Sequence, residues 1–430
     1  MTLIRLNDLP ESYRDRVQKR LKAYDIEALL SLQKLVRERS KKCDETPYTL
    51  LKAKKKGFPL EQKKSAEAFL REKKVAALIL AGGQGSRLGV KGPKGALPVS
   101  LIKKKTLFEL MADRIKAASR LAGGPLPAAL ITSALNHEET LSFFQKHKFF
   151  GLHPNQIDFV PQKMWPFFDE NGELFLNESG NLAEGPNGNG YSFHLLKNHQ
   201  ILKKWKEMGV ELINTIPIDN PLADPFDLRM IGQNLETPSD LVIKTISSKG
   251  FEEEVGLLAF SNNELTVKEY SERAVKKEEG LAYSGMFMTT LDFADFIASK
   301  LHFLPFHFAK KEGKRANFDQ GVLKEIPITF IKLEAFIFDL FKQAKKVSLL
   351  LTDPEEAFSP IKQQKGKSSY EKAQADLWER DRKMYKKIFK KEAPLEKFEL
   401  DSVFYYLTEE EIQKIEEITF DDNNYLTLIF

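Results

Sequence analysis

The chain has 430 residues, of which 42% are hydrophobic and 30% are charged, and its formal net charge at pH 7 is +5. This composition is typical of a globular protein with a large core, and it excludes wholesale disorder and a bundle of membrane helices. On length alone, two or three domains are expected.

The first residues do not form the apolar run of a secretory signal, and no later segment approaches the roughly 20 apolar residues of a membrane helix. Cys43 is the only cysteine, so an intramolecular disulfide or a cysteine-rich zinc site is excluded. These features predict a cytoplasmic protein without a membrane anchor. Lysine groups at 54–56 and 103–105 are flanked by acidic and apolar residues. Solvated helix faces explain them, and no nucleic-acid partner is expected.

Residues 1–70 predict an N-terminal helical region, since leucines such as Leu29 and Leu32 lie in a charged sequence without strand alternation. Residues 75–81 are continuously apolar, as in a buried parallel strand. A helix is expected to follow Thr106, because Glu109 matches the spacing of a capping box. Strand, loop and helix together form a βα unit.

This alternation continues along the next part of the chain. The predicted strands are 127–132, 157–160 and 210–218, and the predicted helices are 138–146 and 192–208. The pattern predicts an open, mostly parallel α/β sheet.

Strands dominate between about residues 240 and 290, at 241–246, 256–260, 265–270 and 285–289. They predict a mixed or antiparallel extension of the sheet. Helices are then expected at 291–300 and 333–345, and a strand at 347–351. The highly charged remainder predicts a small C-terminal subdomain over 366–430.

A glycine-rich loop follows the first predicted strand and is the strongest functional signal in the sequence. It reads Leu-Ala-Gly-Gly-Gln-Gly-Ser-Arg-Leu-Gly over residues 80–89 and closes with Pro-Lys-Gly at 93–95. Glycines after a strand let backbone N–H groups approach a phosphate closely, and cations in the same loop neutralise it. With Arg87 and Lys94 as these cations, the loop predicts a nucleotide phosphate site.

Two familiar nucleotide loops fit this spacing poorly. A dinucleotide fingerprint needs G-x-G-x-x-G opening into a helix and an acidic residue roughly 20 positions later, where this chain has lysines at 103–105. A P-loop needs G-x-x-x-x-G-K-[ST], but neither Gly92 nor Gly95 is followed by this pair. A triphosphate loop, in which Arg87 and Lys94 hold the pyrophosphate end, is favoured over these loops and over a plain glycine turn.

The loop resembles that of the eukaryotic-type UDP-sugar pyrophosphorylases, and most closely that of the UDP-N-acetylglucosamine pyrophosphorylases. The family's loop reads L-A-G-G-Q-G-T-R-L-G followed by P-K-G, so the chain differs only at Ser86. Further matching segments occur in the family's order at 147–152, 175–178, 188–190, 219–220, 269–272, 336–339 and 358–362. The resemblance implies a catalytic domain over 71–365 with a Rossmann-like, glycosyltransferase-A-like nucleotidyltransferase fold, an α/β mixed sheet flanked by helices.

The resemblance also implies a reaction in which a sugar 1-phosphate oxygen attacks the α-phosphorus of UTP, pyrophosphate leaves and a UDP-sugar forms. Catalysis then depends on alignment and on cancelling crowded negative charge. By the family's pattern, Arg87 and Lys94 hold the β- and γ-phosphates, and Lys362 contacts the α-phosphate and the sugar phosphate. Asp219 follows an apolar strand, where open α/β sheets place ligand-binding groups. It is the expected ligand of Mg²⁺, the expected cofactor.

The same resemblance assigns the groups that bind uridine and sugar. The uridine pocket comprises backbone groups of Ala81 and Gly82, the side-chain amide of Gln162 and the turn formed by Gly188, Asn189 and Gly190. Further expected substrate-binding residues are Gly83, Lys244, Glu269, Ser284, Gly285, Phe336 and Phe338. A carboxylate such as that of Glu269 can accept bonds from two sugar hydroxyls. Read from the residues alone, the two phenylalanines are equally well explained as core.

The chain departs from the family at the sugar pocket. Where the N-acetylglucosamine enzymes carry Asn-Ala-Gly-Asn, residues 283–286 read Tyr-Ser-Gly-Met, so both asparagines are absent. UDP-N-acetylglucosamine is the expected product, and UDP-glucose or a broader set of UDP-sugars is the alternative. The expected partners are UTP and a hexose 1-phosphate, and the expected oligomeric state is a monomer. A non-catalytic nucleotide-sugar sensor is disfavoured, because it could lose the charged residues that this chain retains.

Overall fold

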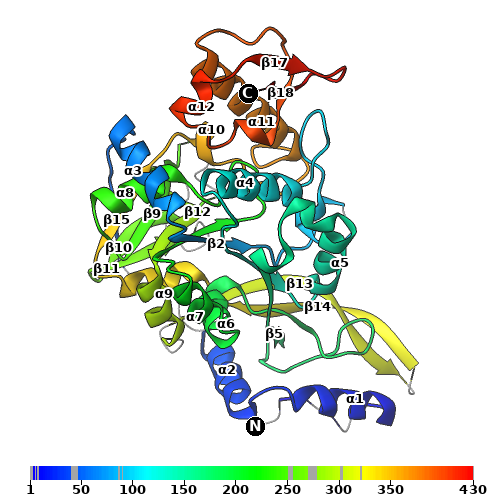
Figure 1. Cartoon of the computed structure of the whole chain (residues 1–430). Helices are drawn as coiled ribbons and strands as arrows, with labels where there is room; N and C mark the ends of the chain where they lie inside the picture. The colour runs from blue at the N-terminus through cyan, green and yellow to red at the C-terminus, as the bar shows by residue number, and fades with distance from the viewer. Residues whose placement is uncertain are drawn as a thin grey trace.

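The computed structural model describes residues 3–4, 6, 9–39, 47–85, 88–89, 91–249, 255–269, 278–300, 304–319 and 322–429. A mixed sheet lies at its centre, and helices cover both of its faces (Figure 1). The described strands lie in the order β1 (Thr49–Leu50), β10 (Leu257–Ser261), β12 (Leu281–Thr290), β8 (Leu212–Pro217), β2 (Val75–Leu80), β3 (Ala128–Ser133) and β4 (Ile157–Gln162). Three further strands extend this sheet: β11 (Glu264–Lys268) pairs with β10, β9 (Leu241–Ser247) pairs with β12, and β15 (Val347–Leu351) pairs with β9.

The directions of the strands confirm the predicted mixed sheet. β8, β2, β3 and β4 run parallel to one another. β12 runs antiparallel to β8 and β9, and β10 runs antiparallel to β11. The carboxyl ends of the parallel strands therefore share one edge, at which ligand-binding loops gather in open α/β sheets.

Alternate residues of β2 belong to two different cores. Val75, Ala77 and Ile79 pack with α3 (Leu60–Arg71), α4 (Leu107–Leu121) and α8 (Leu228–Glu236). Ala76 and Leu78 pack on the other face with α6 (Ser192–Asn198), α7 (Ile201–Glu207) and α9 (Leu291–Ala298). All five residues are fully buried, as expected for a strand covered by helices on both faces. α5 (His137–Lys146) packs beside β3 and β4.

Two of the helices expected from the sequence differ in the structure. The predicted helix over 192–208 is divided into α6 and α7, because Gln200 adopts a left-handed backbone with φ 60°, which a right-handed helix does not accommodate. The predicted helix over 333–345 is wrong at its start, because residues up to Glu334 belong to β14 (Val322–Glu334). Only Ile337–Gln343 is helical, as the 3₁₀ helix η9.

The N-terminal helices lie at the opposite end of the molecule from the C-terminal residues (Figure 1). α1 (Glu11–Leu21) and α2 (Ile26–Arg39) share a hydrophobic cluster with β6 (Phe168–Asp169) and β14. β14 pairs along its full length with β13 (His307–Asp319) in a long antiparallel ladder that no sequence pattern predicts. β1 joins the central sheet and α3 packs against α8, so these parts of residues 47–71 pack with the central sheet and its helices.

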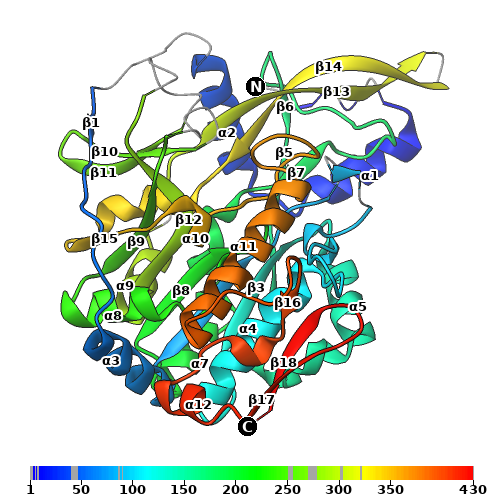
Figure 2. The ribbon, with the colours of Figure 1, turned by 90° about the horizontal axis from the view of Figure 1, so that it is seen from above.

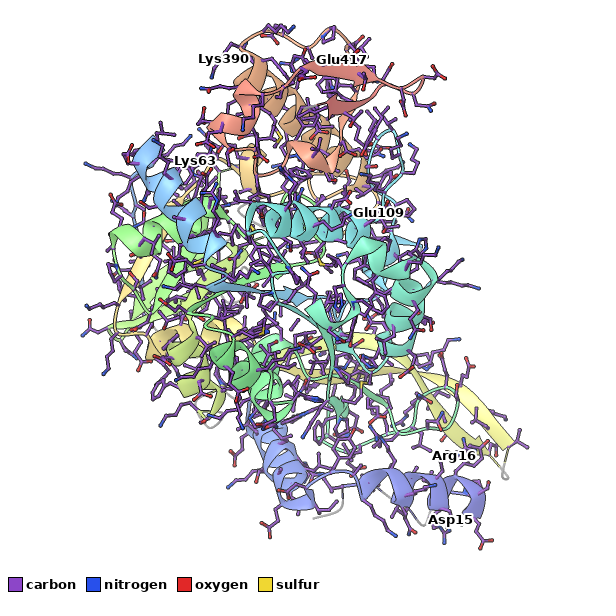
Figure 3. All side chains as sticks on the ribbon, in the orientation of Figure 1. Asp15, Arg16, Lys63, Glu109, Lys390 and Glu417 are labelled. Atoms are coloured by element: carbon purple, nitrogen blue, oxygen red, sulfur yellow. The ribbon has the colours of Figure 1, made fainter. Side chains whose placement is uncertain are left out.

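The C-terminal residues form a subdomain with its own hydrophobic cluster. It consists of α11 (Tyr370–Phe389), β16 (Glu399–Leu400), α12 (Glu409–Gln413), β17 (Glu417–Phe420) and β18 (Tyr425–Ile429). It lies against α4, and Figure 3 places its Lys390 and Glu417 above Glu109 of that helix. Figure 2 shows α11 lying across the molecule above α4 and β3. No helix of the described residues is long and apolar enough to cross a bilayer.

Candidate active site

The glycine loop is held in place by a buried asparagine. The side-chain amide of Asn136 donates to the carbonyl oxygens of Ala81 and Gly83, at 3.1 Å each, and its Oδ1 accepts from the backbone N–H of Ser133 at 2.8 Å. Asn136 is fully buried. Its position before α5 resembles an ordinary helix cap, so the sequence gives no sign of its contact with the glycine loop. Its bonds instead join the loop after β2 to the end of β3.

Two glycines in the loop are required by close neighbours. A Cβ atom at Gly82 would lie 2.9 Å from Oε1 of Gln162, so glycine lets this amide lie directly against the loop. A Cβ atom at Gly95 would collide with the Phe108 ring of α4. The loop therefore lies between the side-chain amide of Gln162 on one side and α4 on the other.

Lys94 and Asp219 meet at the carboxyl end of the parallel strands. Lys94 begins the 3₁₀ helix η3 (Lys94–Ala96), and its backbone N–H donates to Gly83. Its ammonium lies 3.0 Å from Oδ2 of Asp219, which follows β8. The two side chains are 13% and 26% exposed, respectively. Both charges therefore remain open to a ligand in the same place.

The segment that carries Lys362 is hydrogen-bonded to the Asp219 turn. The backbone N–H of Ile361 donates to the carbonyl oxygen of Asp219 at 2.9 Å. Asn220 accepts from the N–H of Ser359 at 3.0 Å and donates to the carbonyl oxygen of Ala357 at 2.7 Å. Lys362 is exposed beside these bonds. Arg87 lies outside the described residues.

The predicted uridine turn lies against the segment that carries the two phenylalanines. The N–H of Ala335 donates to Asn187, and the N–H of Gly190 donates back to Ala335. The Asn189 side chain accepts from the N–H of Ile337 at 3.0 Å. Gly188 has φ 90°, and a Cβ atom there would collide with the Ala335 carbonyl oxygen. These bonds bring Gly188 and Asn189 together with Phe336 and Phe338.

The two phenylalanines stack on one another, with ring centroids 5.1 Å apart. Phe338 is 6% exposed and belongs to a core cluster, whereas Phe336 is only partly buried. The His307 ring lies 4.8 Å from Phe336, and its Nε2 lies 2.8 Å from Oδ2 of Asp339. No sequence motif singled out His307.

The residues expected on the sugar side meet around a bulge in β12. Gly285 has φ 82° and interrupts the pairing of β12 with β9, and a Cβ atom there would lie 3.3 Å from Pro217, close to Asp219 in the chain. The buried Ser284 hydroxyl donates to the carbonyl oxygen of Lys244 at 2.6 Å. Burial and the nearby Glu269 carboxylate raise the pKa of the Tyr283 hydroxyl.

Lys244, a predicted binding residue, has its charged group buried inside the protein. Its side chain is 8% exposed and forms an ion pair with Asp227. Asp227 also caps α8 by accepting from the N–H groups of Arg229 and Met230. Burial acts to raise the pKa of Asp227, but the Lys244 ammonium outweighs burial and holds that pKa below its ordinary value. The pair joins β9 to the end of the loop that connects β8 with α8.

A cleft of about 520 Å³ continues outward from Gln162. Trp165 and Tyr191 line it on the side of the sheet, and Tyr24 and Leu29 line it on the side of α1 and α2. Burial raises the pKa of Tyr191 to about 12, so its hydroxyl stays protonated at neutral pH. The N-terminal helices thus form one wall of a cavity beside the predicted uridine pocket.

Comparisons with known proteins show the family to which the chain is similar. Residues 29–286 match the family described as UTP–glucose-1-phosphate uridylyltransferase. The chain is 33% identical over 306 residues to the UDP-N-acetylhexosamine pyrophosphorylase-like protein 1 of Mus musculus, covering 67% of this chain and 60% of that protein. It is 31% identical over 306 residues to the UDP-N-acetylglucosamine pyrophosphorylase of Saccharomyces cerevisiae, covering 67% of this chain and 64% of that protein.

A solved structure shares the fold. The uridine diphosphate N-acetylglucosamine pyrophosphorylase of Trypanosoma brucei superposes with a TM-score of 0.75 at 23% identity, covering 92% of this chain and 88% of that one. The predicted fold class is thereby confirmed. The match spans less than two thirds of the length of the mouse and yeast relatives. On the extent of the family match, the chain belongs to the UTP–glucose-1-phosphate uridylyltransferase family, as the resemblance of its glycine loop predicts.

Proposed function

We propose that this protein is a uridylyltransferase that joins UTP to a hexose 1-phosphate and releases pyrophosphate. The observation that carries the proposal is the meeting of Lys94, Asp219 and the Lys362 segment beside the glycine loop. Two cations and one carboxylate at the edge of a parallel sheet suit a reaction in which phosphate charge must be neutralised and aligned.

The arrangement gives each side chain a separate task. Lys94 lies against Gly83, and we assign its ammonium to the terminal phosphates of a nucleotide whose base contacts Gln162. Lys362 follows Ile361, whose N–H donates to the carbonyl oxygen of Asp219, and we assign it to the attacking sugar phosphate. The sugar phosphate oxygen is itself the nucleophile, so the reaction requires neither a covalent intermediate on the protein nor a general base to activate the nucleophile.

Asp219 fits a magnesium ion. Mg²⁺ is usually held by one or two carboxylates together with substrate phosphates and water, and Asp219 supplies a partly exposed carboxylate next to the phosphate-binding lysine. When bound, the ion would neutralise charge on the phosphates. Asp219 would hold it, and Lys94 would exchange its carboxylate partner for a phosphate.

N-acetylglucosamine 1-phosphate is the sugar phosphate that we favour. Both relatives described above are named for UDP-N-acetylhexosamine or UDP-N-acetylglucosamine, and the partly buried Phe336 offers an apolar face for an acetyl group. Glucose 1-phosphate is the second candidate, because Tyr283 and Met286 occupy the positions at which the UDP-N-acetylglucosamine pyrophosphorylases carry asparagines.

A pyrophosphate-release assay with UTP and a panel of hexose 1-phosphates tests the proposal. Turnover is expected with N-acetylglucosamine 1-phosphate in the presence of Mg²⁺ and not after chelation with EDTA. Other nucleoside triphosphates serve as controls and are expected to react poorly. Absence of turnover with every sugar, in a folded protein that does not bind UTP in calorimetry, would overturn the proposal.

The remaining parts of the proposal concern setting and assembly. A single cysteine suits a reducing compartment, and we place the protein in the cytoplasm. We also infer that it acts as a monomer and that its partners are these small molecules, without a nucleic acid or a membrane. Light scattering and a salt titration of RNA binding check these inferences.

A further inference from the structure

The loop that follows Asp219 is held by a buried arginine. The guanidinium of Arg114, on α4, donates to the carbonyl oxygens of Pro221 and Ala223. Arg114 is 4% exposed. A guanidinium presents several donors in a rigid plane, so it fixes two nearby carbonyl groups of one turn, on either side of Leu222. The turn begins with Asp219.

The C-terminal subdomain reaches the same loop. The Tyr406 hydroxyl donates to the Asp224 carboxylate, which also accepts from the N–H of Phe226 at 3.0 Å. The neighbouring Tyr405 ring lies 5.5 Å from the guanidinium carbon of Arg114. Tyr406 thus contacts the loop directly, and Tyr405 contacts the arginine that holds it.

The same subdomain also holds the segment that carries Lys362. The Ser359 hydroxyl donates to Oδ2 of Asp376, on α11, at 2.6 Å. Both Ser359 and Asp376 are buried. The N–H of Lys362 donates to the carbonyl oxygen of Ser368, immediately before α11, at 2.8 Å. α11 therefore supports the second reactive segment directly.

The geometry points to a role for the C-terminal subdomain: Tyr406 and Asp376 are positioning residues that set Asp219 and Lys362 relative to one another. This inference rests on the proposed function. Asp219 and Lys362 come from segments far apart in the sequence, and the subdomain contacts both. Catalysis by alignment is sensitive to such support, because a displacement of about 1 Å can cost on the order of 100-fold in rate.

Two tyrosines of the subdomain offer a matched test. Tyr406 bonds to Asp224 of the loop, whereas Tyr425 bonds to Asp401 within the subdomain and to Lys105. In Tyr406→Phe we expect kcat to fall on the order of 10-fold and the Mg²⁺ concentration for half-maximal rate to rise. Amide hydrogen exchange in residues 217–226 should accelerate as well. In Tyr425→Phe these three quantities should stay within about 2-fold of the wild type.

A second pair of variants tests whether α11 supports the segment that carries Lys362. Asp376→Ala and Asp376→Asn both lose the ion pair with Lys372, but asparagine retains an oxygen that can accept from Ser359. The alanine variant should lose turnover, and the asparagine variant should recover most of it. Because these two variants do not depend on Tyr406, they keep the inference testable if Tyr406→Phe fails to fold.

Equal behaviour of Tyr406→Phe and Tyr425→Phe in an active protein would overturn the inference, as would equal loss in the two Asp376 variants. An inactive wild type would overturn the proposed function instead. Hydrogen exchange in residues 217–226 would still test the positioning contacts in that case, because it requires no turnover.

Discussion

The Lys94 ammonium lies 3.0 Å from the Asp219 carboxylate, so the two groups expected to hold phosphate and metal neutralise each other. A partly exposed pair of this kind contributes about 0 to 1 kcal/mol to stability. Breaking this ion pair therefore costs little free energy if a triphosphate binds Lys94 and a cation binds Asp219. The ion pair also holds the two side chains next to one another.

Lys94→Ala should separate catalysis from stability. We expect kcat to fall about 10²- to 10³-fold, because a charge that stabilises the leaving phosphates is removed, while the free energy of unfolding changes by about 1 kcal/mol or less. Lys204→Ala is the matched control, since Lys204 forms a 2.9 Å ion pair with Asp158 away from the site. Steady-state kinetics and urea denaturation measure both effects. Comparable rate losses in the two variants would contradict the role of Lys94.

Lys362→Ala should act through chemistry alone. Lys362 is exposed, so its truncation should change the free energy of unfolding by about 1 kcal/mol or less. The kcat should nevertheless fall about 10²-fold, because the sugar phosphate loses its cation. Lys365→Ala, in the same exposed segment, should leave both quantities unchanged. An active Lys362→Ala enzyme would remove this residue from the site.

Phe336→Ala should alter the choice of sugar. If the ring of Phe336 covers an acetyl group, the KM for N-acetylglucosamine 1-phosphate should rise about 10-fold, and the KM for glucose 1-phosphate should change little. Phe296 on α9 is 46% exposed and serves as the control truncation. A parallel rise of both KM values in Phe336→Ala would mean that the ring does not read the acetyl group.

Asp227→Asn should destabilise the protein in a pH-dependent way. Asparagine can still cap α8, but the buried Lys244 loses its partner, which costs about 3 to 5 kcal/mol at pH 7. The pKa of Asp227 lies below its ordinary value of 3.8, so its ion pair stabilises the wild type above that value. This stabilisation is lost as pH falls through the lowered pKa. The difference in the free energy of unfolding between wild type and variant should therefore become smaller below about pH 4. Urea denaturation at several pH values measures this difference. A difference that stays constant down to pH 3 would contradict the assignment.

Local sequence patterns predict the parts of the fold that local forces determine. The apolar run at β2 and the Thr106 cap, whose side chain accepts from the N–H of Glu109 at 3.2 Å, both occur as expected. The 333–345 segment does not form the expected helix, because partners distant in sequence take its backbone groups. The N–H of Ala335 and of Ile337 bond to Asn187 and Asn189, and no local pattern reports such bonds.

The same division holds for the site. The glycine loop and its cations have a signature because backbone approach to phosphate requires glycine at fixed places. Asn136 and Arg114 have none, since each acts on carbonyl oxygens that any residue could supply. Lys244 was expected among the binding residues from resemblance, and only the structure reveals that its ammonium faces Asp227.

The contact between Tyr406 and Asp224 joins a late part of the chain to an early one. Domains generally begin to fold during synthesis, starting from the N-terminal side. A ribosome therefore exposes the whole parallel half of the sheet while the turn after β8 still lacks its outer support. If the protein has the proposed activity, a newly made chain should reach its full rate of turnover only after residue 406 has emerged from the ribosome.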